Sequence, residues 1–273
     1  MRSILLHIHE DDCQEARFQT ALDLARHFDA HLTCVHAVPY EFGVPGDFYG
    51  TMASQLAIEY EKNARTIREK FKKRLAAEDV SWEWIFSNGP ASQLIKNYAP
   101  LSDVVVLGAR NPVGSPDHPS LLVTELIGAV RPPLMVVPAN MGPFILETPA
   151  VVAWNGSAEA SHAIAAALPI LKLASEVHIL EVEEEEKPRL HKKLPATEAA
   201  EFLARHEIEA EIVKFPMDKK ASIAAGILNA ATIRQAGYLV MGAYGHSRLR
   251  ERILGGVTRE LLKDPKIPLI LSH

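Results

Sequence analysis

The stretch that decides the fold reads VMGAYG at residues 240–245 and, after nine further residues, GGVT at residues 255–258. An apolar, strand-like run ends at Gly242, and a helical pattern begins after Gly256. Glycines at such a junction leave backbone N–H groups uncovered at a helix start, where the helix dipole also favours an anion. The stretch therefore predicts a strand, loop and helix unit with phosphate binding as its leading function. Taken singly, the same glycines would be explained by a strand end and a turn.

The strand and helix pattern occurs twice along the chain, which indicates two α/β units with largely parallel sheets. The expected strands cover residues 4–8, 32–38, 82–86, 104–108 and 134–137 in the first half, and 151–154, 177–182, 211–215, 238–242 and 269–271 in the second. The expected helices cover residues 13–27, 52–77, 93–98, 121–130, 159–171, 197–205 and 223–236, with a last helix after Gly256. Duplication explains this repeat. We expect two tandem doubly wound α/β domains, each with a mainly parallel five-stranded sheet.

The boundary between the two domains is expected at the sequence PANMGP, residues 138–143. Its proline and glycine content stops both helix and strand. The predicted domains are therefore residues 1–140 and 141–273. Four consecutive glutamates at 183–186 are followed by several basic residues, and this charged stretch is most simply a solvated loop.

Composition limits the classes of function. The chain of 273 residues has a formal net charge of −5 and a sequence pI near 6.2, which makes nucleic acid and anionic membranes unfavourable partners. Cys13 and Cys34 give no disulfide framework or metal box, and the first apolar run is too short for a secretory signal. No apolar stretch is long enough to span a bilayer. We expect a cytoplasmic protein.

Gly242, Gly245 and Gly255 together resemble the glycine signature of the universal stress protein family, in which the third glycine is followed by Ser or Thr. Gly256 stands where that family places a hydroxyl residue, so one side-chain donor to a phosphate is lost while the backbone donors remain. The resemblance covers nearly the full chain and is strongest at residues 238–271.

The resemblance also implies an assembly and a ligand. The family's five-stranded sheets pair through their last strands, so residues 134–137 would pair with 269–271 in an internal pseudo-dimer, which could form a further homodimer. The implied ligand is ATP or another adenine nucleotide, with or without Mg²⁺. The implied nucleotide-binding residues are Ala153, Trp154, Asn155, Val182, Gly242, Gly245, Gly255, Gly256, Val257 and Thr258.

Three of these residues have alternative roles. Asn155 replaces the family's acidic residue, and it offers a donor and an acceptor but no charge. Trp154 could stack on a base or fill the place of one. Thr258 could cap the helix start without any ligand.

The first half carries a degenerate version of the glycine loop. When Gly108 is laid over Gly242, Leu121 meets Gly255 and Leu122 meets Gly256, and Asn111 meets Gly245. Prolines at 112, 116 and 119 occur only in this first loop. Branched side chains and prolines replace the bare amides that a phosphate needs. We therefore expect the nucleotide site in the second half only.

Other motifs carry less chemistry. His7 and His9 could bind a metal with a third ligand, but no Cys or His spacing supports it, so no metal site is predicted. Arginines at 248, 250 and 252 could clamp a phosphate or decorate an exposed loop. The chain lacks a Gly-x-Ser-x-Gly elbow and a P-loop. We predict no catalytic residue and at most slow ATP hydrolysis.

Two functions from different classes follow. The first is a stress-linked regulatory module that binds an adenine nucleotide, for which a Gly245→Val change would abolish binding in a folded protein. The second is a nucleotide-free scaffold that binds a protein partner or another small ligand. The feature that separates them is whether the crevice beside Gly242 and Asn155 is open or filled by Trp154.

Overall fold

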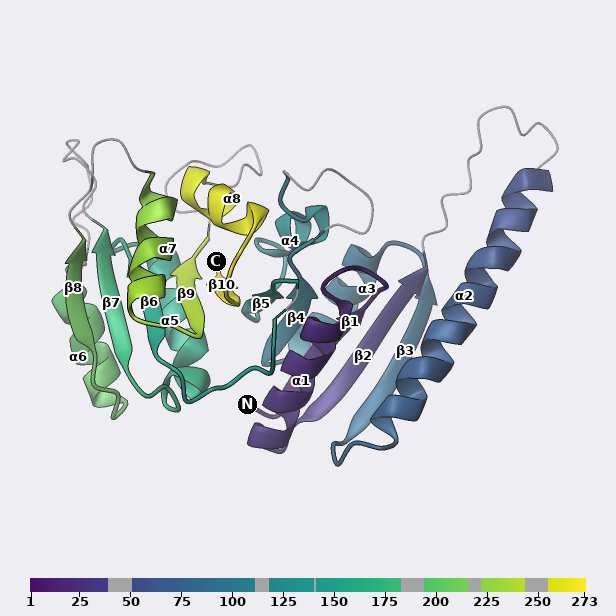
Figure 1. Ribbon diagram of the computed structural model, residues 1–273, viewed down its shortest axis with the longest axis horizontal. Helices are drawn as coiled ribbons and strands as arrows, with labels where there is room; N and C mark the ends of the chain where they lie inside the picture. Colours follow the sequence, from purple (N-terminus) through teal and green to yellow (C-terminus); the bar gives the residue numbers. More distant parts are fainter. Residues whose placement is uncertain (39–50, 111–117, 140, 183–193, 216–221, 244–254) are drawn as a thin grey trace.

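The computed structural model describes residues 1–38, 51–110, 118–139, 141–182, 194–215, 222–243 and 255–273 (Figure 1). Strands and helices alternate through both halves. The first half contains β1 (Ser3–Ile8), α1 (Gln14–Phe28), β2 (His31–Val38), α2 (Thr51–Leu75), β3 (Trp82–Asn88), α3 (Ala91–Tyr98), a 3-10 turn (Ala99–Leu101), β4 (Val104–Gly108), α4 (Leu121–Leu126) and β5 (Leu134–Val137). The second half contains β6 (Ala150–Trp154), α5 (Ala158–Leu171), β7 (Val177–Val182), α6 (Ala196–Arg205), β8 (Glu211–Phe215), α7 (Ile223–Ile233), β9 (Tyr238–Gly242), α8 (Gly256–Lys263) and β10 (Leu269–Ser272).

The ten strands of the described residues form one sheet, in the order β3-β2-β1-β4-β5-β10-β9-β6-β7-β8. Each half has the same internal order, and within each half every strand pairing is parallel. The halves join where β5 pairs antiparallel with β10, with Met135 opposite Ile270. The predicted fold class is confirmed, and the strands that meet are the two last strands named above.

Helices cover both faces of this sheet because its strands are apolar on both faces. One buried cluster lies between the sheet and α1, α2, α5 and α6. The other lies between the sheet and α3, α4, α7 and α8. Since parallel strands end at the same edge, the loops that follow β6 and β9 meet at one place, where a doubly wound sheet binds its ligands.

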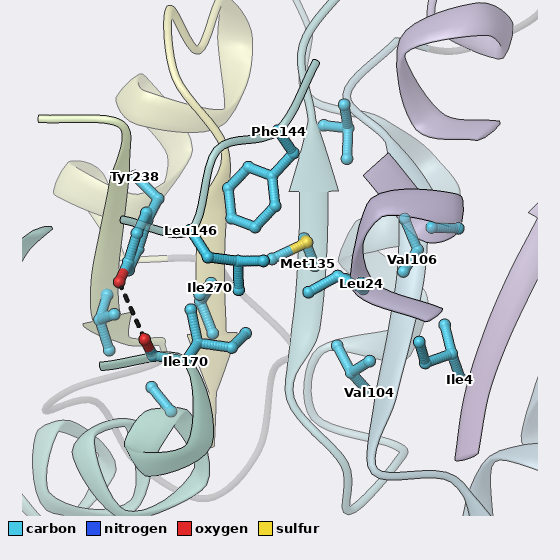
Figure 2. Close-up of a cluster of buried hydrophobic side chains, with 14 of the residues drawn as sticks. Ile4, Leu24, Val104, Val106, Met135, Phe144, Leu146, Ile170, Tyr238 and Ile270 are labelled. Carbon is cyan, nitrogen blue, oxygen red and sulfur yellow. Dashed lines mark hydrogen bonds between the residues drawn. The ribbon is translucent and has the colours of Figure 1, made fainter. Parts of the chain in front are cut away.

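The connection between the halves is part of the core. Phe144 and Leu146 are 4% and 3% exposed and lie over the β5–β10 seam (Figure 2). The Phe144 ring packs against that of Tyr238 at 5.7 Å between centroids, and the Tyr238 hydroxyl donates a hydrogen bond to the Ile170 carbonyl at 3.2 Å. The backbone N–H of Phe144 also donates to a carboxylate oxygen of Asp23 in α1. The segment after the predicted boundary therefore packs against both halves.

Candidate functional site

A crevice opens at the carboxyl edge of the second half, between the ends of β6 and β9 and the starts of α7 and α8. Its cavity has a volume of about 170 Å³. Most of the residues predicted for the site share this cavity. The lining consists of Ala153, Trp154, Asn155, Ile223, Ile227, Met241, Gly242, Gly255, Gly256, Val257 and Thr258.

Gly242 ends β9 where the first turn of α5 passes very close. A Cβ atom built on Gly242 would lie 2.5 Å from the backbone nitrogen of Ala160 and 2.5 Å from the carbonyl carbon of Glu159. No real Cβ contact is that short, and neither atom is a flexible side-chain end. Glycine is therefore required here by helix packing, whether or not a ligand is bound.

Gly255 and Gly256 differ from Gly242 because the space around them is open. Among the described residues, a Cβ atom at either position would meet nothing within 4 Å. Gly255 is the N-cap of α8, and no side chain in the described part of the chain caps this helix. The first N–H groups of a helix have no acceptor within it, so those of Gly256, Val257 and Thr258 are left for another partner. All three residues line the crevice.

Thr258 is the third residue of α8 and is 5% exposed. Because Gly255 occupies the cap position, Thr258 does not serve as the N-cap of this helix. This buried residue carries a hydroxyl group and lines the crevice in the first turn of the helix.

The turn between β6 and α5 supplies the opposite wall. The side-chain oxygen of Asn155 accepts a hydrogen bond from the Ser157 N–H at 3.1 Å, and Gly156 has a φ of +73° that suits glycine. Ser157 then caps α5 by accepting from the Ala160 N–H at 3.2 Å. The turn is thus fixed by its own sequence, and the Asn155 amide nitrogen remains as the donor that this side chain can offer a ligand.

Trp154 does not fill the crevice with its ring. The residue is 3% exposed and belongs to the buried cluster on the α5 and α6 face, opposite to the face that carries α7 and α8. Its indole N–H donates to the Leu194 carbonyl at 3.0 Å. The ring is therefore held against the start of α6 and does not fill the crevice beside Gly242.

Three further wall residues were not predicted from the sequence. Ile223, Ile227 and Met241 give the crevice an apolar side. The sequence feature that could have indicated this wall is the strand β8 followed by a helix that starts at Ser222. The start of that helix must lie at the same edge of the sheet as the glycine loop. Ser222 caps α7 and also donates to the Glu260 carboxylate of α8 at 2.6 Å, which ties the two helix starts together.

The remaining predicted residues lie elsewhere. Val182 ends β7 opposite Phe215 in the neighbouring strand, and the described lining of the cavity does not include it. Gly245, the arginines at 248, 250 and 252, Asn111, the prolines at 112 and 116, and the charged stretch at 183–193 lie outside the described residues.

The matching helix start in the first half is closed by its own side chain. Ser120 is 2% exposed, caps α4 by accepting from the Val123 N–H at 3.5 Å, and its carbonyl accepts from the Thr124 hydroxyl at 2.9 Å. Leu121 and Leu122 stand where the second half has Gly255 and Gly256. The bare amides of α8 have no equivalent here.

The ranges that the structure describes contain no cluster of three or more His, Cys, Asp or Glu side chains arranged to hold a metal ion. They also contain no helix that is long and apolar enough to cross a membrane.

Residues 148–273 match the model of the universal stress protein family. These residues form a universal stress protein domain. The match begins two residues before β6 and includes every described residue that lines the crevice.

The fold of the whole chain is similar to that of solved universal stress proteins. One from Archaeoglobus fulgidus DSM 4304 is 15% identical with a TM-score of 0.73, covering 98% of this chain and 97% of that chain. A Pseudomonas aeruginosa UCBPP-PA14 protein described as a universal stress protein is 14% identical with a TM-score of 0.60, covering 100% of this chain and 93% of that chain. No curated protein sequence matches the chain. At these sequence identities, the two structures support the fold of both halves and give no evidence for a ligand.

Proposed function

We propose that the crevice of the universal stress protein domain binds an adenine nucleotide such as ATP, and that this binding makes the chain a stress-linked regulatory module. The observation that carries the proposal is the start of α8, which no side chain among the described residues caps and whose Gly255 and Gly256 line a cavity of about 170 Å³. The backbone N–H groups of such a helix start, together with the helix dipole, favour a phosphate.

The walls suit the rest of a nucleotide. Ile223, Ile227 and Met241 offer apolar contact to a base, and the Asn155 amide offers a hydrogen bond to the nucleoside. Trp154 leaves this space open because its ring is held on the other face of the sheet. A magnesium ion, where it is bound, would come with the phosphates, since the described residues of the crevice include no carboxylate.

Calorimetry with ATP and AMP, with and without Mg²⁺, tests the proposal after any nucleotide carried through purification has been removed. We expect saturable binding near one nucleotide per chain. The Gly256→Leu variant copies Leu122 of the first half and places a side chain over the N–H groups. Because a Cβ there meets nothing within 4 Å, the variant should fold normally and bind at least about tenfold more weakly, a loss of about 1.4 kcal/mol.

The Gly142→Leu variant is the matched control. Gly142 is also open, with nothing within 4 Å of an added Cβ, and it lies in the connection between the halves. It should bind like the unmodified chain. No binding by the well-folded unmodified protein would contradict the proposal and favour the scaffold, whose partner would then be sought among proteins or other small ligands.

A further inference from the structure

The turn between β6 and α5 contains a chemically reactive dipeptide, Asn155 followed by Gly156. Asn-Gly occurs at two places in the chain, here and at Asn88 and Gly89, where β3 ends. In this dipeptide the backbone nitrogen of glycine can attack the side-chain amide carbon of asparagine, because glycine has no Cβ to hinder the approach. Asparagine is one of the thermolabile residues of proteins. The two pairs allow a comparison within one molecule.

The local structure at Asn155 favours this attack. Asn155 and Gly156 are partly exposed, and Asn155 lines the crevice, which gives water access to its amide. The side-chain oxygen of Asn155 accepts from the Ser157 N–H at 3.1 Å, so the side chain folds back over the Gly156 peptide unit. In the described part of the chain, the Gly156 N–H has no hydrogen-bond acceptor. Among these residues, therefore, nothing engages the attacking nitrogen, and the turn brings the carbon toward it.

The same turn stabilises the charge that the attack develops. When the nitrogen adds to the amide carbon, negative charge collects on the side-chain oxygen, to which the Ser157 N–H already donates. Ser157 is the N-cap of α5, so the positive end of that helix dipole lies beside the same oxygen. The fold thus supplies a donor and a dipole at the atom that becomes charged.

Asn88 and Gly89 have the same chemistry in different surroundings. Asn88 pairs with Val38 in the sheet, and the Gly89 N–H donates to the Val38 carbonyl at 2.7 Å. Attack by this nitrogen requires the hydrogen bond to break and the strand end to open. Asn88 is nevertheless the more exposed of the two asparagines. Exposure alone therefore predicts that Asn88 reacts first, whereas hydrogen bonding predicts that Asn155 does.

We propose that Asn155 is a site of spontaneous deamidation, at which the folded protein converts this asparagine to aspartate and isoaspartate. The Gly156 nitrogen loses its proton and forms a bond to the Asn155 side-chain carbon. The bond from that carbon to its amide nitrogen breaks, and ammonia leaves with the proton. Water then opens the succinimide ring, adding its hydroxyl to a ring carbonyl carbon and its proton to the ring nitrogen. Opening at the side-chain carbon gives aspartate, and opening at the main-chain carbon gives isoaspartate.

Deamidation changes the chemistry of the crevice wall. Either product has a carboxylate in place of the amide, which adds one negative charge to the formal net charge of −5. The described residues that line the crevice include no other carboxylate. An occupant that contacts the Asn155 amide shields it from water, so a bound nucleotide slows the reaction. This protection rests on the function proposed above, whereas the deamidation itself does not.

Peptide mass spectrometry of the full chain, incubated at neutral pH in ¹⁸O-labelled water, measures the conversion of both asparagines. We expect Asn155 to convert at least about tenfold faster than Asn88, a difference of about 1.4 kcal/mol in activation free energy, which is the size of one hydrogen bond. Each product should contain one ¹⁸O atom, because water opens the ring. In urea, which unfolds the chain, the two asparagines should convert at similar rates.

Two variants provide matched controls, and thermal melting shows whether each is folded. Asn155→Gln keeps an amide but lengthens the side chain by one methylene, so ring closure involves a larger ring and conversion at this position should fall at least about tenfold. Asn88→Gln makes the same change at the other pair and should leave the conversion of Asn155 unchanged.

Conversion of Asn155 no faster than that of Asn88 in the folded protein would overturn the proposal, whatever the effect of ATP. A difference that persists in urea would also overturn it, because the cause would then be the flanking sequence. Saturating ATP should slow the conversion of Asn155 and leave that of Asn88 unchanged. Rapid conversion of Asn155 that ATP does not slow would count against the nucleotide site and would still support the deamidation site.

Discussion

Gly242 and Gly256 belong to one glycine signature, yet the structure predicts opposite effects when each is changed to alanine. The added Cβ at Gly242 would lie 2.5 Å from two backbone atoms of α5, so β9 and α5 must move apart. Overpacking of this kind costs about 1–3 kcal/mol, and the lower entropy of unfolded alanine returns about 0.4–1 kcal/mol. We expect Gly242→Ala to reduce the free energy of unfolding by about 1–2 kcal/mol.

Gly256→Ala should do the reverse. The position is the first residue of α8, its added Cβ meets nothing within 4 Å, and alanine has the higher helix propensity. We expect an unchanged or slightly raised stability, by up to about 1 kcal/mol, while nucleotide affinity falls because the methyl group lies at the crevice.

Urea unfolding and thermal melting of both variants measure these changes. At roughly 2–4 °C per kcal/mol, the melting temperature of Gly242→Ala should fall by about 2–8 °C. Gly108→Ala is the matched variant in the first half, where the added Cβ would lie 2.9 Å from Cβ of Cys13. A Gly242→Ala protein as stable as the unmodified chain would refute the close approach of α5. A large loss of stability in Gly256→Ala would refute the open position of that glycine.

Two further predictions concern buried ionisable groups. Arg17→Ala leaves the Asp11 carboxylate buried without its partner, so we expect the free energy of unfolding, measured with urea, to fall by about 3–5 kcal/mol. The loss should be smaller when Asp11→Asn is added. Equal losses in the single and double variants would contradict the buried pair. Burial, with a smaller contribution from His9, lowers the pKa of His36 from 6.5 to about 4, so the unfolded chain binds a proton in that window while the folded chain does not. Stability should therefore fall by about 3 kcal/mol as the pH drops from 6.5 to 4, and the fall should be smaller in His36→Phe.

The sequence predicted every strand because apolar runs of strand length are bounded by turn residues in both halves. Helix ends were less predictable. The helix expected at 121–130 stops at Leu126, since the chain tightens into a turn in which the Ala129 N–H bonds the Leu126 carbonyl before Pro132. The helix expected to reach 236 stops at Ile233 because Gln235 takes a left-handed φ of +52°. Both ends depend on local geometry that periodicity does not encode.

Residues around the crevice could be predicted where the backbone conformation determines the residue type. They could not be predicted where packing between distant segments determines the direction of a side chain. Glycine spacing placed Gly255 and Gly256 at a helix start, and the structure has them there. The direction of the Trp154 ring depends on a hydrogen bond to Leu194, forty residues away, and no local pattern reveals it. The pairing of Arg17 with Asp11 was likewise missed, although their spacing around the start of a helix was the available signal.

Different physical causes explain the glycines that occur in both halves and the glycines that occur in only one half. Gly108 and Gly242 sit at equivalent strand ends, and in each case the helix that follows the neighbouring strand, α1 or α5, leaves no room for a Cβ, so the fold itself requires them. No described residue lies within 4 Å of a Cβ built on Gly255 or Gly256, and their counterparts in the first half are leucines at the start of α4. The fold does not require these two glycines. What they add is access to the backbone N–H groups of α8, and this separates the residues that build the repeat from those that would select a ligand.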